Sequence, residues 1–234
     1  MNENNAVARL RSQLSLMFKL QDELNCQVAP DWVERKFGWH RALYIEAAEY
    51  LEHMGDWKWW KKGTPDLAQA RMELVDIWHF GLSMMLESSG GSPDNTSWLL
   101  KNLPGTLLKT MASQAVEGDL VQARHCLVDD LVGIAAGERW FAEGAFVKLM
   151  ALDGLSVDEL FKLYVGKNML NRFRQDNGYK SGTYVKGWAD GREDNEHLSE
   201  LLEHLPADET LPTRILEALA IRYAEAKAVA GSTA

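Results

Sequence analysis

The chain has 234 residues, enough for one large domain or two small ones, and 46% of them are hydrophobic, so a sizeable core is available. The formal net charge of -9 argues against a protein that binds nucleic acid through a general positive surface. Two isolated cysteines, Cys26 and Cys126, lack metal-ligand spacing and indicate reduced thiols. The reduced thiols favour a cytoplasmic location. We expect no signal peptide, because the N-terminus is polar, and no membrane span, because no apolar run is long enough.

The first predicted helix carries an apolar stripe through Leu10, Leu14 and Phe18. The same face continues to Gln21 and Asn25, where two amides replace apolar side chains. Two interpretations are open. Either the helix frays before the proline that follows, or a buried amide pair contacts the polar edge of a ligand. Because an amide both donates and accepts hydrogen bonds, the second interpretation suits a nucleobase.

The next two predicted helices each carry two carboxylates three residues apart, Glu46 with Glu49 and Glu73 with Asp76. At this spacing both side chains of a pair lie on one helix face. The second helix is apolar nearly all round, which predicts burial, and buried carboxylates are costly unless they are paired or bind metal. Four oxygen ligands without cysteine favour Mg²⁺, with Mn²⁺ as a substitute. Two solvated acidic helix faces are the alternative.

A loop dense in tryptophan and lysine joins these two helices. Gly55 ends the first helix, and Thr64-Pro65-Asp66 marks the start of the second, which is expected at about 67–86. Between them, residues 57–61 read Trp-Lys-Trp-Trp-Lys. The loop therefore places aromatic rings and positive charges next to the acidic pairs in the sequence.

The remaining chain shows helical periodicity and no strand-like alternation. Amphipathic helices are expected between positions 98 and 152, and a capping box of Ser156 and Glu159 opens another helix. A last helix is expected at about 213–228. The sequence therefore predicts an all-α protein in a single catalytic domain, 1–234, with flexible ends at 1–5 and 230–234.

The charge reverses between positions 167 and 186. Five basic residues share this stretch with one acidic residue, Asp176, so its local net charge is about +4. Gly178 and Gly182 would let the backbone approach a ligand closely, and arginine and lysine suit a phosphate chain. An ordinary basic loop is the alternative. The basic residues are Lys167, Arg172, Arg174, Lys180 and Lys186.

Together these features describe hydrolysis of a nucleoside polyphosphate. Metals held by the four carboxylates would bridge phosphate oxygens and lower the pKa of a bound water. Glu49 would orient or deprotonate that water. Basic side chains would neutralise charge on the leaving group.

As a set, the motifs resemble the five motifs of the dimeric, all-α dUTPases, within the all-α NTP pyrophosphatase superfamily. They fall at about 17–86 and 160–188, and none falls in 88–155. The residues that carry the resemblance are Gln21-x-x-x-Asn25, Glu46-x-x-Glu49, Lys58-Trp59-Trp60-Lys61, Glu73-x-x-Asp76 and Asn171-x-Phe173-Arg174-x-x-Asn177-Gly178-Tyr179.

The resemblance implies a homodimeric helical bundle that hydrolyses dUTP to dUMP and pyrophosphate with Mg²⁺, and that accepts dUDP as well. It implies that Glu46, Glu49, Glu73 and Asp76 bind the metal, with Glu49 and Glu46 as catalytic residues. Base and sugar would be held by Gln21, Asn25, Trp60, His79, Phe80 and Asn171. The phosphates would be held by Lys58, Lys61, Lys167, Arg174, Tyr179, Lys180 and Lys186.

Three alternatives stay open at this point. A dCTP/dUTP hydrolase or a broader NTP pyrophosphatase of the same superfamily would share the fold, because amides can present either hydrogen-bond pattern. A di-iron carboxylate protein is more remote. Asp76-x-x-His79 imitates its carboxylate–histidine spacing, but Glu46-x-x-Glu49 offers no histidine. The third alternative is a non-enzymatic helical dimer whose charges are structural.

Overall fold

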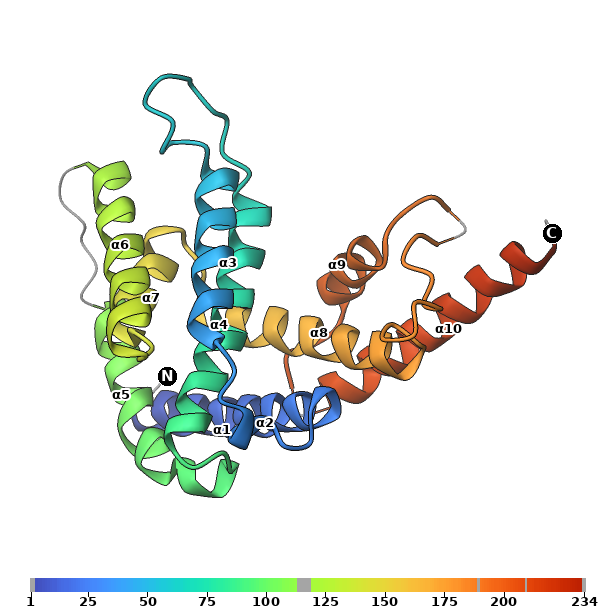
Figure 1. Cartoon of the computed structure of the whole chain (residues 1–234), viewed down its shortest axis with the longest axis horizontal. Coiled ribbons are helices and arrows are strands. Elements are labelled where there is room, and N and C mark those ends of the chain that lie inside the picture. Colours follow the sequence, from blue (N-terminus) through green and yellow to red (C-terminus); the bar gives the residue numbers. More distant parts are fainter. Residues whose placement is uncertain (1–2, 113–118, 189, 209, 233–234) are drawn as a thin grey trace. The chain divides into compact units, whose positions relative to one another are not determined.

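The computed structural model describes residues 3–112, 119–188, 190–208 and 210–232 (Figure 1). Throughout that part of the chain the regular structure is helical, apart from an isolated bridge between Gly187 and Glu193. The predicted all-α class is therefore confirmed. The chain divides into two compact units, Met1–Leu160 and Phe161–Ala234. A single catalytic domain spanning both stays a prediction.

In the N-terminal unit, α4 lies among the other helices. It packs along α3 and also contacts α1 and α7, while α6 packs against α3 and α7. The elements are α1 (Glu3–Val28), α2 (Trp32–Arg35), α3 (Trp39–Met54), α4 (Leu67–Ser88), the 3-10 helix η1 (Pro93–Thr96), α5 (Ser97–Ala112), α6 (Leu120–Glu138) and α7 (Glu143–Leu152).

Helix α4 is buried on nearly every side, as its all-round apolar sequence predicts. The ring of Trp78 stacks on Phe146, with centroids 5.2 Å apart, and meets the ring of Phe141 edge-on at 5.7 Å. Its indole N–H donates to the Met17 sulfur of α1 at 3.3 Å. The next turn needs Gly81, because a Cβ there would lie 2.6 Å from the Phe141 ring. Tight aromatic packing thus fixes how α4 lies between its neighbours.

Helix α8 (Val157–Asp176) starts with the predicted capping box. The Glu159 N–H donates to the Ser156 hydroxyl at 3.2 Å, and the Ser156 N–H donates to the Glu159 carboxylate at 2.9 Å. The capping box thus gives partners to two backbone N–H groups at the start of the helix.

The C-terminal unit holds the greater part of α8 together with α9 (Asp194–His204) and α10 (Leu211–Ser232). Tyr223 of α10 stacks on Tyr184 at 5.1 Å and meets Phe173 edge-on at 5.4 Å, so that aromatic rings form much of the core.

Helix α10 is longer than the predicted 213–228. The ends predicted to be flexible, 1–5 and 230–234, lie partly outside the described residues. Positions 3–5 and 230–232 belong to α1 and α10. Within the described chain, every helix is too short or too polar to cross a membrane.

Candidate functional site

Three carboxylates from two helices converge in the N-terminal unit. Glu46 and Glu49 of α3 and Glu73 of α4 each offer an oxygen that lies within 4.8 Å of the others. The convergence follows from the i, i+3 spacing and from the packing of α3 along α4. Glu73 is buried, Glu46 is half-buried and Glu49 is exposed. The cluster is therefore anchored in the core at one end and reaches solvent at the other.

The electrostatics of the cluster bring in the fourth predicted carboxylate. Burial raises the pKa of Glu46 to about 8, with further increases from the charges of Asp76, Glu73 and Glu49 and from a hydrogen bond with Glu73. Asp76 thus acts on the same site. Oxygen donors that repel one another at this range suit a hard divalent cation, whose charge would relieve the repulsion. The residues present therefore fit Mg²⁺.

His53 is a basic neighbour that sequence reasoning missed. Its Nε2 lies 3.4 Å from Oε1 of Glu73. The signal was available, because His53 follows Glu46 by seven residues and so lies on the same face of α3. Arg71, two residues before Glu73 in the sequence, donates to the Asp153 carbonyl at 2.6 Å.

The amide pair predicted on α1 forms a buried network with α4. Gln21 and Asn25 are 4% and 5% exposed, so the helix does not fray at this point. His79 Nδ1 lies 3.2 Å from Gln21 Oε1, and the Gln21 amide donates to Asn25 Oδ1 at 3.0 Å. The Asn25 amide then donates to the Ser83 hydroxyl at 3.1 Å. Ser83 was missed by the sequence reasoning, and its position four residues after His79 was the signal.

Phe80 lies beside a tryptophan that was also missed. The rings of Phe80 and Trp39 are stacked, with centroids 6.5 Å apart and an angle of 29° between planes. Trp32 and Phe37 meet Trp39 edge-on at 5.9 and 5.4 Å. Trp39 lies seven residues before Glu46 and so shares its face of α3. Phe80 therefore packs in an aromatic cluster with Trp32, Phe37 and Trp39.

The segment between α3 and α4 forms a hollowed loop, residues 55–63, which we call the tryptophan loop. It surrounds a hollow of about 410 Å³ lined by its own tryptophans and lysines. Trp60 is 59% exposed and meets Trp57 and Trp59 edge-on. Lys58 lies over the Trp57 ring and pairs with Glu52. The loop thus presents rings and cations to solvent, as the sequence suggests.

In the C-terminal unit, Arg174 has an internal partner. Its Nε and Nη2 both donate to the Asp194 carboxylate at 2.8 Å, and Asp194 is fully buried. Nη1 donates to Asn171 at 3.2 Å. Lys186 pairs with Glu193 at 2.7 Å. Phosphate contacts by Arg174 and Lys186 stay predictions, and Arg174 has a structural role in addition.

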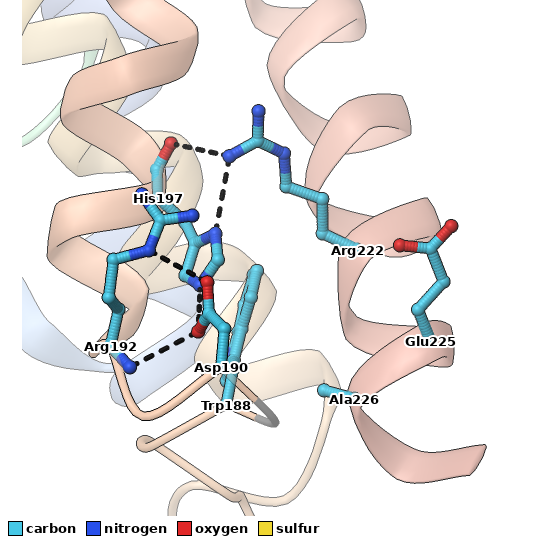
Figure 2. Close-up of a pocket in the computed structure, with 7 residues that line it drawn as sticks. All are labelled: Trp188, Asp190, Arg192, His197, Arg222, Glu225 and Ala226. Carbon is cyan, nitrogen blue, oxygen red and sulfur yellow. Dashed lines mark hydrogen bonds and ion pairs between the residues drawn. The ribbon is translucent and has the colours of Figure 1, made fainter. Parts of the chain in front are cut away.

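A second cavity, of about 260 Å³, lies in the C-terminal unit (Figure 2). His197 stacks on Trp188 at 4.3 Å and points Nε2 at Asp190 and Nδ1 at Arg222, 3.1 and 3.2 Å away. Arg192 pairs with Asp190 at 2.7 Å, and Figure 2 shows these groups turned toward one another. Because Asp190, Arg192, His197 and Arg222 find partners within the unit, this network is best explained as structural.

A protein-family model matches a large part of the chain. A family model described as dUTPase matches residues 13–179. The matched part contains the carboxylate cluster, the amide network, the aromatic cluster and the tryptophan loop, and it leaves Lys180, Lys186 and the second cavity outside. No curated protein matches the chain.

Proposed function

This chain belongs to the dUTPase family, and from that premise we propose that it hydrolyses dUTP to dUMP and pyrophosphate with Mg²⁺. Family membership supports a nucleotide hydrolase in general. The particular nucleotide, the cation and activity on dUDP are the content of the proposal. The observation that carries it is the convergence of Glu46, Glu49 and Glu73 within 4.8 Å.

The carboxylates have distinct roles in this proposal. Glu46, Glu49, Glu73 and Asp76 would hold the cation, which, when bound, supplies Lewis-acid stabilisation of phosphate oxygens and an acidified water. Glu49, the exposed member of the cluster, would in addition orient or deprotonate a water.

The neighbouring groups would bind the rest of the nucleotide. Gln21 and Asn25 would recognise the base with their amides, and Trp60 would stack on it. His79 and Phe80 would contact the deoxyribose, and the lysines of the tryptophan loop would contact phosphates. The roles of Asn171, Lys167, Tyr179 and Lys180 rest on the motif resemblance alone.

The direct test is pyrophosphate release from dUTP, dCTP, dTTP and UTP, each with Mg²⁺ and with excess EDTA. We expect strong, Mg²⁺-dependent preference for dUTP. Comparable activity on dCTP would keep the metal site and replace the uracil-specific assignment with the dCTP/dUTP hydrolase alternative. Absence of activity on all four nucleotides would contradict the proposal.

The Glu49 assignment has its own test. Glu49→Gln keeps the size of the side chain and removes its basicity, so turnover of dUTP should fall by about 10²-fold or more while nucleotide binding is largely kept. Glu217→Gln, on an exposed position of α10, is the matched control. Near-normal turnover of Glu49→Gln would remove it from the base role.

A homodimer is part of the proposal, since the family resemblance implies one. Sedimentation equilibrium at several protein concentrations measures it directly. A mass twice that of the 26.4 kDa chain supports the dimer, and the mass of one chain at all concentrations would exclude it.

A further inference from the structure

The tryptophan loop closes on itself at its two ends. Gly55 has a φ of +65°, and a Cβ on Gly63 would lie 2.4 Å from the Gly55 carbonyl oxygen. Both positions therefore require glycine. We call the contact between Gly55 and Gly63 the neck of the loop. Next to this neck, the Asp66 N–H donates to the His53 carbonyl at 2.8 Å. The loop is an Ω-loop whose two ends touch.

Asp56, the first residue beyond the neck, is held by two consecutive residues of α6. Arg124 Nη1 donates to Asp56 Oδ2 at 2.8 Å, and His125 Nε2 lies 3.1 Å from Asp56 Oδ1. Arg124 is 8% exposed, so this ion pair is largely removed from water. Each oxygen of the Asp56 carboxylate thus has a partner on α6.

The core fixes Arg124 from the other side. Its Nε donates to the Tyr50 hydroxyl at 3.0 Å, and Nη2 donates to Asp153 Oδ1 at 3.0 Å. The Tyr50 hydroxyl donates in turn to Asp153 Oδ2 at 2.5 Å, and the Asp153 side chain is fully buried. Moving Arg124 would leave a buried carboxylate without its cation, which is costly. The guanidinium is therefore a rigid point to which Asp56 is tied.

We propose that Arg124 and His125 are positioning residues that hold the tryptophan loop ready for nucleotide through Asp56. This inference rests on the proposed function, in which the loop supplies Trp60 and its lysines to the substrate. Positions 59–63 are exposed, so contacts with the core at Asp56 matter for their order. A loop ordered in advance lowers the entropic cost of binding. Helix α6, which lies in the stretch 88–155 without motifs, thereby contributes to nucleotide recognition.

The test variant is Asp56→Asn, which removes the charge on the loop side and keeps the contacts of Arg124 with the core. Limited digestion with trypsin reports the loop without any nucleotide, because Lys58, Lys61 and Lys62 lie in it. Cleavage of a segment that opens transiently follows its open population. We expect cleavage at these lysines, mapped by mass spectrometry, to become about tenfold faster, which corresponds to about 1.4 kcal/mol.

The kinetic constants of Asp56→Asn distinguish a role of Asp56 in positioning the loop for nucleotide from a role in stability alone. KM for dUTP should rise by about tenfold in Asp56→Asn, while kcat changes by less than about twofold, because the reacting groups stay in place. Asp208→Asn is the matched control, since Asp208 forms an exposed pair with Arg214 at 3.5 Å in the other unit. It should change neither cleavage nor KM.

Arg124→Lys is the second variant. Lysine keeps the positive charge and loses the planar fork, so cleavage in the loop should again be faster than in wild type. Because this change also disturbs the contacts with Tyr50 and Asp153, Asp56→Asn decides alone if Arg124→Lys fails to fold.

Each outcome has a distinct meaning. Unchanged cleavage in Asp56→Asn would overturn the proposal. Faster cleavage with an unchanged KM would overturn the positioning role and leave the dUTPase assignment standing. A wild-type protein inactive on every nucleotide would overturn the proposed function and, with it, the role in recognition. Faster cleavage together with a raised KM is the supporting result.

Discussion

At the scale of the residue, Glu46 of the carboxylate cluster has a clearly raised pKa. Burial and three neighbouring carboxylates raise its pKa from 4.5 to about 8. The metal-free folded protein therefore keeps a proton on Glu46 that the unfolded chain releases at a much lower pH. A cation that binds the cluster must displace this proton, so its affinity should increase with pH.

This pKa predicts how the stability of the metal-free protein depends on pH. Because the folded pKa is raised, the stabilisation from the bound proton is fully present below about pH 4.5 and is lost as the pH rises to about 8. After allowance for solvent screening, the loss should be about 1–2 kcal/mol. Urea unfolding in EDTA across this range measures it. In Glu46→Gln the dependence should be much weaker, and an unchanged slope in that variant would assign it to another group.

We expect Phe80 to favour deoxyribose over ribose in the nucleotide. Phe80→Ala should raise activity on UTP relative to dUTP by about tenfold, because the smaller side chain leaves room for a 2′-hydroxyl. The ratio of kcat/KM values for the two nucleotides measures the effect. Trp98→Ala, at an exposed position of α5, is an aromatic control that should leave the ratio unchanged. An unchanged ratio in Phe80→Ala would place sugar discrimination elsewhere.

At the scale of the element, α4 is held by close aromatic contact with the segment before α7. Gly81→Ala would bring a Cβ to within 2.6 Å of the Phe141 ring. We expect it to destabilise the protein by about 1–3 kcal/mol, although alanine favours a helix more than glycine does. Urea unfolding of Gly81→Ala, Phe141→Leu and the double variant measures the coupling. Fully additive effects in the double variant would contradict a clash with this ring.

The elements also show what the sequence could predict. The paired carboxylates, the burial of α4 and the capping box at Ser156 follow from spacing within one helix, and all three were predicted. Ser83 and Trp39 share helix faces with predicted site residues, so periodicity could have indicated them. The tie between Arg124 and Asp56 joins positions 68 apart in the sequence, and no local pattern encodes such a meeting. Contacts made by tertiary packing are what the sequence reasoning could not supply.

At the scale of the whole molecule, the chain divides into two units, so the stability of each unit can be measured separately. Asp194, fully buried, pairs with Arg174 inside the C-terminal unit. Asp194→Ala would leave that guanidinium without its buried partner and should cost about 3–5 kcal/mol. Hydrogen exchange should show lost protection mainly within 161–226. Asp190→Ala, which removes an exposed pair with Arg192 and the contact with His197, is the milder control because Asp190 itself is exposed. Equal loss of protection in both units would show that they unfold together.

The touching ends of the tryptophan loop have a consequence for engineering. Because Gly55 and Gly63 meet, the chain returns to its starting point across the loop, and we expect the residues between the two glycines to be exchangeable as a unit. Lengthening such a segment costs little, since closure entropy grows only slowly with length. Libraries of inserts between the glycines that retain Asp56 could therefore alter which nucleotides are accepted without disturbing the helices beneath.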